Sequence, residues 1–414
     1  MNQRLTKPIL LSLNLAAVLW YWLLQHSLLN FRDIGRQLYA TGDAQEYREY
    51  ALWLRGASSY CNPMRTFLYP LVIWLSGGGI CLWLLQAAGW LLACNLIFLA
   101  IRRQTGNPWL AVAGFILTCA NLSLLGLTFH ALVEITAFLL LAAMVYLFAQ
   151  QAERWKEPRV QLWLLGLLAF LAVAKPLYQP LWNLLMLVFL GSTMLRKRRM
   201  PWIWLLLAVL PVITQKVISL KSTGSLTSSG IGASDLKKYF YRKTLYLADH
   251  GTLDGFNGMN DSLLALQIAK AVNSSAAEEW RFLIAHPFAD ARVMLADMQE
   301  NIGDPFPYFY KNKNPWIVAW NTGFNRVMLY IHGIFFLLWI GWLLLHRREH
   351  GEGRWRYFLW LGMMLQFIFF SAGLVFWAGD RLVAPATALW VPLYLMLGAA
   401  FLRAKTGNKR TPLI

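Results

Sequence analysis

Long apolar stretches recur along the whole chain, and they constrain its fold more than any other feature. A helix of about 20 apolar residues is long enough to cross the hydrocarbon core of a bilayer. Hydrophobic residues make up 58% of the 414 positions and charged residues only 14%. Lipid offers the backbone no hydrogen-bond partners, so each crossing segment must be a helix. The sequence therefore predicts an all-α polytopic membrane protein.

Ten apolar segments have the length and composition expected of transmembrane helices. They are residues 8–29, 80–101, 108–126, 132–150, 160–176, 180–195, 201–220, 325–345, 356–377 and 382–402. Their spacing divides the chain into an N-terminal transmembrane module (1–220), a larger segment outside the membrane (221–324) and C-terminal transmembrane helices (325–414).

Two regions are expected to lie outside the membrane on the same side. The first, about 30–79, includes the apolar piece TFLYPLVIWL. Pro70 and the glycines at 77–79 make this piece too short to span, so we expect a helix lying at the interface. The second, 221–324, contains the basic aromatic run DLKKYFYRKTLYLAD and two helical patterns near 262–285 and 288–302. It is long enough for a small domain or a lid.

The basic residues are placed unevenly and predict the orientation. The formal net charge is +18, and half of the 38 lysines and arginines fall in short clusters on one side of the predicted spans. This is the asymmetry of cytoplasmic loops, and it puts both termini in the cytoplasm. The first segment is too long for a cleaved signal peptide and is expected to be a signal-anchor span. No soluble basic domain with interleaved aromatics accompanies the charge, so nucleic acid is not an expected partner.

No cofactor is indicated by the sequence. The four cysteines form no CxxC pair and no Cys/His spacing typical of zinc, and no other metal-ligand pattern is present. The nucleotide-binding patterns GxxxxGK[ST] and GxGxxG are also missing. We therefore expect no metal and no bound nucleotide.

The stretch GDAQEYREY at 42–50 gathers three carboxylates in the first outer region. Asp43, Glu46 and Tyr47 are spaced to share one face of a helix that begins near Gly42. The positive end of the helix dipole would keep Asp43 ionised. Spacing alone favours a simpler interpretation, in which this is a solvated helix with a capping aspartate and surface Glu–Arg pairs.

Glu134 opens the fourth apolar segment, in TFHALVEITAFLLLAA. An ionisable group at such depth is costly, and is usually interior, paired and functional. His130, one helical turn earlier, is a plausible partner. A glutamate at the end of a helix that reaches the headgroups is an equally good interpretation.

Two cationic positions are expected to face the same side. Lys175, in LAVAKPLYQP, follows an apolar run; it either reaches the outer interface or faces a lipid phosphate in a cavity. Arg381, in the short outer turn FWAGDRL, breaks the charge asymmetry, and a guanidinium suits bidentate phosphate binding. A surface pair between Asp380 and Arg381 is the alternative.

Together these carboxylates and cations suit a reaction at a phosphate-linked substrate. A carboxylate near an acceptor hydroxyl can act as a general base. A cation near the leaving phosphate stabilises the charge that develops there. Because no nucleotide site is present, a phosphate carried by a membrane lipid is the expected donor.

At these residues the chain resembles the integral-membrane glycosyltransferases of the GT-C fold, which use polyprenyl-phosphate sugars. The matching elements are Asp43-Ala44 with Tyr47 and Ala51, then Arg65 with Tyr69-Pro70, then Glu134, then Lys175-Pro176, and finally Arg381-Leu382 with Pro385. The resemblance covers most of the chain. It implies transfer of a sugar from polyprenyl phosphate to a glycan, lipid or protein acceptor, on the periplasmic side of a bacterial inner membrane.

The resemblance also implies roles for individual residues. Asp43 would activate the acceptor hydroxyl with Glu46 or Glu134 in support, and Arg381, Lys175 and Arg65 would hold the donor phosphate. We expect Tyr47, Tyr69 and His130 to line the substrate site. Two other functions fit the sequence. One is an O-antigen-type polymerase or ligase that uses the basic run around Arg242 and Lys243. The other is a lipid or small-molecule transporter, although no internal repeat is visible.

Overall fold

The structure is a computed structural model of the chain. It describes residues 6–28, 33–59, 61, 65–195, 200–224, 226, 229, 240–254, 256, 275–305, 315–345, 352–375 and 379–405. The described secondary structure consists of helices, and no strand occurs among these residues. The all-α expectation is confirmed for this part of the chain.

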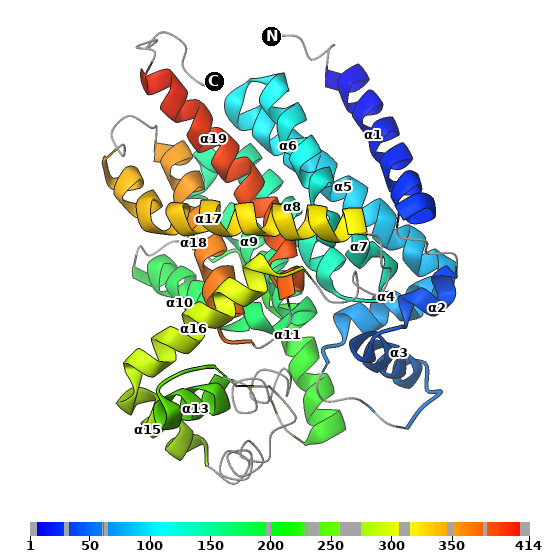
Figure 1. Cartoon of the computed structure of the whole chain (residues 1–414), viewed down its shortest axis with the longest axis vertical. Coiled ribbons are helices and arrows are strands. Elements are labelled where there is room, and N and C mark those ends of the chain that lie inside the picture. The colour runs from blue at the N-terminus through cyan, green and yellow to red at the C-terminus, as the bar shows by residue number, and fades with distance from the viewer. Residues whose placement is uncertain are drawn as a thin grey trace.

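A helix occupies each of the ten apolar segments. They are α1 (Thr6–Leu23), α5 (Gly79–Thr105), α6 (Pro108–Ala120) with α7 (Leu122–Gly126), α8 (Glu134–Gln151), α9 (Pro158–Ala174), α10 (Gln179–Leu195), α11 (Trp202–Thr223), α17 (Pro315–Leu345), α18 (Glu352–Ala372) and α19 (Thr387–Lys405). In Figure 1, α1 begins and α19 ends at the same end of the molecule. α3 (Gly42–Leu54) and α13 (Arg242–His250) lie toward the other end.

Four of the described helices are long and apolar enough to cross a membrane by themselves: α1, α5, α8 and α11. A fifth span results if α6 and the following helical residues to Phe129 count as one, although they bend by 59° at Asn121. Asn121 causes the break because its side chain accepts a hydrogen bond from the N–H of Leu124 and so caps a new helix. The structure is that of a helical membrane protein, with ten spans remaining an expectation.

Helix α17 differs from the expected segment in its start and direction. It begins at Pro315, ten residues before the predicted span, and its first turns lie inside the segment assigned to the outer region. Hydropathy missed these turns because they carry the polar Asn321 and run up to the polar Asn325; both side chains are buried against protein. In Figure 1, α17 runs across the direction of α5, α6 and α19.

The first outer region folds into short helices. α2 (Ile34–Leu38) leads to α3, and α4 (Leu68–Ser76) ends at Gly77, which takes the left-handed conformation (φ 75°) suited to glycine. The apolar piece predicted to be a short helix is thus helical. In the later outer region α13, α15 (Ala276–Ala285) and α16 (Pro287–Gly303) are described, while residues 262–274 of the predicted pattern lie outside the described residues.

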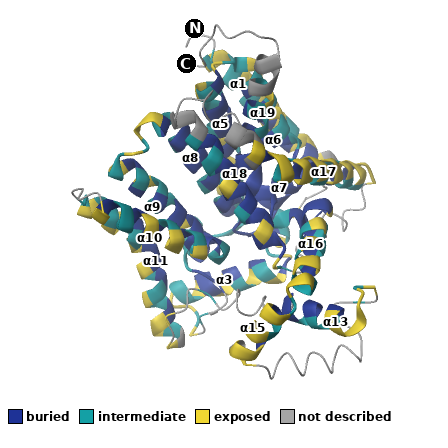
Figure 2. Ribbon diagram, turned by 90° about the vertical axis from the view of Figure 1, so that its left-hand side faces the viewer, coloured by how far each residue is buried: buried dark blue, intermediate teal, exposed yellow. Residues whose placement is uncertain are grey.

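Helix α8 is central and α1 is peripheral. Within the described residues, 56% of an 18-residue apolar stretch of α8 is buried, and only 17% of the corresponding stretch of α1. Figure 2 shows buried residues where α8, α18 and α7 come together. Because α8 begins at Glu134 in this core, its first residue is held among protein groups rather than at the lipid surface.

Candidate functional site

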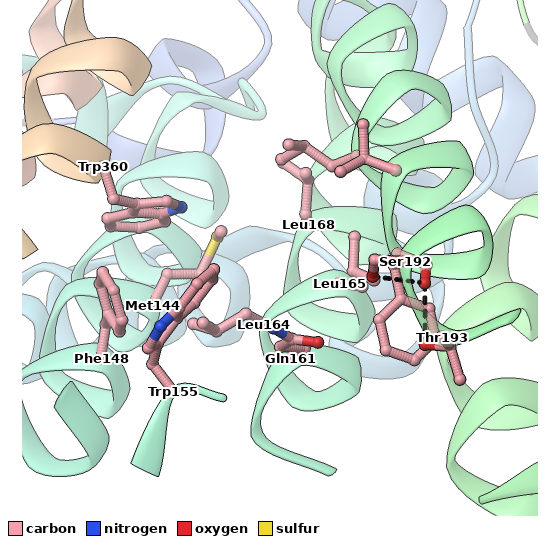
Figure 3. A pocket seen from close by; sticks show the side chains of 13 residues that line it. Met144, Phe148, Trp155, Gln161, Leu164, Leu165, Leu168, Ser192, Thr193 and Trp360 are labelled. Carbon is pink, nitrogen blue, oxygen red and sulfur yellow. Dashed lines mark hydrogen bonds between the residues drawn. The ribbon is translucent and has the colours of Figure 1, made fainter. Parts of the chain in front are cut away.

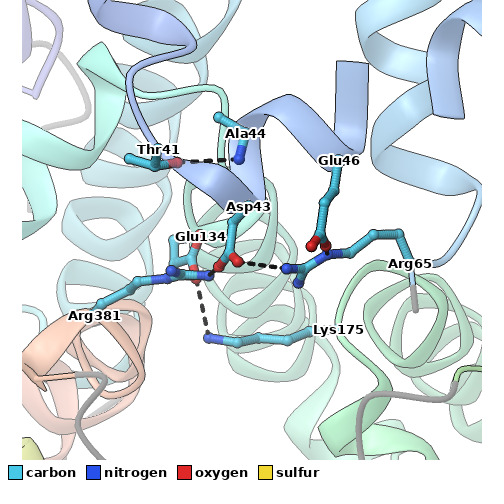
Figure 4. A network of polar contacts seen from close by, with 8 residues as sticks. All are labelled: Thr41, Asp43, Ala44, Glu46, Arg65, Glu134, Lys175 and Arg381. Atoms are coloured by element: carbon cyan, nitrogen blue, oxygen red, sulfur yellow. Dashed lines mark hydrogen bonds and ion pairs between the residues drawn. The ribbon is translucent and has the colours of Figure 1, made fainter. Parts of the chain in front are cut away.

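The site begins with the helix that carries the acidic stretch. Thr41 is the N-cap of α3, and its hydroxyl accepts a hydrogen bond of 3.0 Å from the N–H of Ala44. This cap fixes Asp43 in the first turn, as the sequence predicted. Asp43 and Glu46 point from one face of α3 toward Arg65, while Glu49 is exposed (Figure 4).

Arg65 connects the two acids of α3. Its Nη2 atom lies 2.5 Å from Oδ1 of Asp43, and its Nε donates to Glu46 across 2.6 Å. Arg65 comes from the loop before α4, and only 8% of it is exposed. Its guanidinium also lies over the ring of Tyr47, 5.0 Å from the centroid. Contacts with three side chains therefore fix the position of Arg65.

Arg381 joins the first outer region to the core of the bundle. Its Nη2 atom lies 2.5 Å from Oδ2 of Asp43, and its Nε donates to Oε1 of Glu134 across 2.7 Å. Arg381 belongs to the 3₁₀ turn η8 (Gly379–Arg381), so one side chain ties α3, α8 and the last loop together. Glu134 itself is fully buried.

Lys175 completes the arrangement at its deep end. Its Nζ lies 3.7 Å from Oε1 of Glu134, which is an ion pair beyond hydrogen-bond distance. The six charged groups therefore alternate as Glu46, Arg65, Asp43, Arg381, Glu134 and Lys175 (Figure 4). We call this set the charge chain. Its three carboxylates balance its three cations.

Polar atoms at the deep end lack hydrogen-bond partners. Within the described residues, Oε2 of Glu134, Nζ of Lys175 and the hydroxyl of Tyr178 are buried and form no hydrogen bond. Tyr178 lies in η5 (Pro176–Tyr178), directly after Lys175, and is close enough for the charge of Glu134 to act on its hydroxyl. Buried polar groups are rarely left unsatisfied, so this end of the charge chain has unused capacity for a polar ligand.

An aromatic and amide layer supports the charge chain. The ring of Tyr47 contacts that of Tyr69 edge to face, with centroids 5.0 Å apart. The Tyr69 hydroxyl donates to Gln86 of α5 across 2.7 Å, and the Gln86 amide donates to the carbonyl of Thr128 across 2.9 Å. Tyr47 thus supports Arg65, and Tyr69 links Tyr47 to α5.

Asp43 is ionised over the neutral pH range. Burial raises the pKa of the Asp43 carboxyl, but Arg381 and Arg65 outweigh this effect and bring its pKa below the usual value. Burial, opposed chiefly by Arg65, raises the pKa of Tyr47 to about 12. The site contains a carboxylate and a neutral phenol, and Asp43 is a weak base while both arginines hold it.

A second polar cluster positions the turn that carries Arg381. The carboxylate of Asp380 accepts hydrogen bonds from Ser123 of α7 and from the Asn325 amide of α17. The backbone N–H of Asp380 donates to the carbonyl of Asp304, across 2.9 Å, at the end of α16. Arg381 is therefore oriented by α7, α17 and the outer segment together.

The structure brings the expected charged residues together and decides between the alternatives for them. Glu134 does not reach the headgroups, because it is fully buried and paired with Arg381 and Lys175. Asp380 and Arg381 do not form a pair at the surface, because Asp380 is buried and Arg381 reaches Asp43 and Glu134. Lys175 faces protein and only 8% of it is exposed. His130 is buried in the turn before α8.

Several residues of the site carry no distinctive sequence signal. Tyr178 belongs to the stretch LAVAKPLYQP, three residues after Lys175 and between two prolines. That position is the signal that the sequence offers for it. Gln86, Ser123 and Asn325 are uncharged polar residues in apolar stretches, where the only signal is the cost of burying them. Thr41 stands just before the acidic stretch, which is the N-cap pattern.

No cluster of three or more His, Cys, Asp or Glu side chains suited to a metal ion occurs among the residues that the structure describes. Comparisons with family models, with curated proteins and with solved structures gave no match. The charge chain and its surroundings are therefore the features from which a function can be inferred.

Proposed function

We propose that this protein is a membrane glycosyltransferase that transfers a sugar from a polyprenyl-phosphate donor to a cell-envelope glycan, lipid or protein acceptor. The observation that supports it best is the charge chain, in which three cations and three carboxylates meet at the outer ends of α8 and α9. Five of these six positions, all except Glu46, belong to the resemblance to the GT-C pattern, and this resemblance supports the donor class. The reaction would take place on the periplasmic side of a bacterial inner membrane.

The deep end of the charge chain suits the donor phosphate. Nζ of Lys175 has no hydrogen bond within the described residues, and neither has the Tyr178 hydroxyl, which is also near Glu134. A phosphate oxygen placed there would accept from both groups. Arg381 is the next group in the charge chain, and its guanidinium can turn from a carboxylate to a phosphate because each offers two oxygens for a bidentate contact.

The outer end suits the acceptor. Side chains of Asp43 and Glu46 are 31% and 38% exposed, whereas Glu134 is fully buried. When a phosphate takes over Arg381, Asp43 loses one of its two cations and becomes a stronger base. It then removes the proton from the acceptor hydroxyl, whose oxygen attacks the anomeric carbon. The bond from that carbon to the phosphate oxygen breaks, and polyprenyl phosphate leaves beside Lys175 and Arg381.

A polymerase or ligase that relies on Lys243 is less well supported. Lys243 is buried and pairs with Asp297 of α16, and it lies 3.8 Å from Glu300. Lys243 holds α13 against α16. This structural role explains why a lysine is present at this position, and no substrate contact is needed to explain it.

The test is transfer by purified protein in vesicles that contain a labelled polyprenyl-phosphate sugar and cell-envelope lipids. We expect Asp43→Asn to reduce transfer by about a hundredfold or more. Glu49→Gln, on the exposed side of the same helix, serves as the matched control and should leave transfer unchanged. Normal transfer by a folded Asp43→Asn protein would refute the proposed role. Movement of labelled sugar into vesicles without a glycosidic product would support a transporter instead.

A further inference from the structure

A cavity of about 300 Å³ lies between α8, α9, α10 and α18. Its lining includes Met144 and Phe148 near the end of α8, and Gln161 and Leu164 near the start of α9. Glu134 begins α8 and Lys175 follows the end of α9, so the cavity is at the ends of these helices opposite to the charge chain. It is a separate feature and does not depend on the proposed function.

The lining is mainly apolar. Figure 3 shows Trp360, Phe148 and Trp155 along one side of the cavity and Ser192 with Thr193 on the other. The hydroxyls of Ser192 and Thr193 both donate to the carbonyl of Phe189, so neither needs a ligand. A cavity with such walls holds water poorly and favours an apolar occupant.

One polar group of the lining is unsatisfied. The indole Nε1 of Trp155 is buried and has no hydrogen-bond partner within the described residues. The guanidinium of Arg356 lies over the same ring, 5.0 Å from its centroid. An N–H donor and a cation therefore occur together at the end of the apolar cavity, which is the pair of groups that an anionic headgroup with an apolar tail requires.

The surrounding sequence adds positive charge at the same place. The turn between α8 and α9 carries Arg154, Lys156 and Arg159 against Glu153 and Glu157. Arg154 pairs with Glu157 through bonds of 2.7 and 2.9 Å. With Arg356 included, cations exceed carboxylates at this rim. The excess positive charge would attract an anionic lipid, whereas a zwitterionic lipid, with no net charge, would not be attracted by it.

We propose that this cavity binds an anionic phospholipid from the leaflet at this end of the bundle. One acyl chain enters between α9, α10 and α18. A phosphate or ester oxygen accepts the hydrogen bond from Nε1 of Trp155, and Arg356 neutralises the headgroup. Val188 of α10 lines the cavity and is 58% exposed, so the acyl chain can enter beside it from the lipid side.

The test uses phosphatidylcholine vesicles that contain the protein and a minor fraction of a phospholipid with a photoreactive group on its acyl chain. The headgroup of the probe is either phosphatidylglycerol or phosphatidylcholine. Cross-linked residues are identified by mass spectrometry. We expect phosphatidylglycerol to label Leu164, Leu165 or Leu185 preferentially. Arg356→Gln should lower that preference about fivefold, as expected for one cation near a membrane surface.

Two further variants distinguish the cavity from the general lipid surface. Leu164→Phe fills part of the cavity and should remove the labelling, while Leu187→Phe adds the same ring at a position of α10 that is 68% exposed and should not. Trp155→Phe keeps an aromatic ring for Arg356 but removes the indole N–H, and should weaken labelling. Equal labelling of these residues by the phosphatidylglycerol and phosphatidylcholine probes would overturn the proposal.

Discussion

The Nη2 atom of Arg381 lies 2.5 Å from Oδ2 of Asp43, so the last loop of the chain closes onto a helix of its first outer region. The same guanidinium donates to the buried Glu134. This contact fixes the order of charges in the site. It also means that the two ends of the sequence must both be folded before the site exists.

The geometry of Arg381 predicts that charge alone cannot replace it. Lysine has one ammonium group and cannot bridge Asp43 and Glu134 in the fixed directions of Nη2 and Nε. We expect Arg381→Lys to lower transfer by about a hundredfold. Arg381→Gln leaves Glu134 buried with Lys175 alone and should cost about 3 kcal/mol of stability. Arg154→Lys, at an exposed ion pair, is the control and should change neither transfer nor the thermal unfolding midpoint.

Tyr178 gives a test of ligand binding at the deep end of the charge chain. Its buried hydroxyl has no hydrogen-bond partner within the described residues, so removing it costs the ligand-free protein nothing. We expect Tyr178→Phe to leave the unfolding midpoint unchanged or slightly raised. The KM for the donor should rise about fivefold, as for one lost hydrogen bond of about 1 kcal/mol. A lower unfolding midpoint with unchanged KM would show that the hydroxyl has a structural role instead.

The sequence predicted the local features of this fold and of its site. The apolar segments and the acidic helix that begins at Gly42 depend on near neighbours, and both are present, although Thr41 and not Asp43 is the cap. The contacts between Asp43, Arg381 and Glu134 depend on how distant helices pack, which no local pattern encodes. The start of α17 was missed because Asn321 and Asn325 lower its hydropathy, although they are buried against Ser123 and Asp380. Polar residues that satisfy one another inside a bundle resemble loop residues in the sequence.

The pH dependence of stability should come from the outer segment and not from Asp43. The pKa of Asp43 is lowered, so the stability from its ion pairs is present above the unfolded pKa and is lost only as pH falls through the folded value. Burial, opposed by Lys243, raises the pKa of Asp297 to about 6. Its contribution has the opposite sign: stability is greatest below the unfolded pKa and falls as pH rises toward 6.

Thermal unfolding between pH 5 and pH 8 measures this contribution. We expect the midpoint to fall as pH rises through about 6, with Glu300, whose pKa burial also raises, adding to the same trend. Asp297→Asn should flatten the curve, and Asp254→Asn, at an exposed position, should not. A midpoint that rises through this interval would contradict the assignment to Asp297.

Two membrane helices are joined by a reciprocal pair of amides. The amide of Asn14 in α1 donates to Asn95 in α5 across 2.9 Å, and Asn95 donates back across 2.8 Å. Because α1 is otherwise sparsely packed, Asn14→Leu should cost about 1 kcal/mol of stability. Asn95→Leu should cost a similar amount. The double variant should lose less than the sum, since it leaves no unpaired amide. Additive losses in thermal unfolding would show that the two amides do not interact.

The close approach of α16 to the end of α18 requires a glycine at position 373. A Cβ added there would lie 2.5 Å from Cγ and 2.7 Å from the carbonyl oxygen of Met294, so α16 would have to move. We expect Gly373→Ala to cost about 1–3 kcal/mol. Transfer should also fall, because α16 ends at Asp304, which holds the turn of Arg381. Gly398→Ala, where nothing lies within 4 Å of the added atom, is the control and should keep full transfer. If Gly373→Ala destabilises the protein but transfer per folded molecule is normal, the outer segment does not position Arg381.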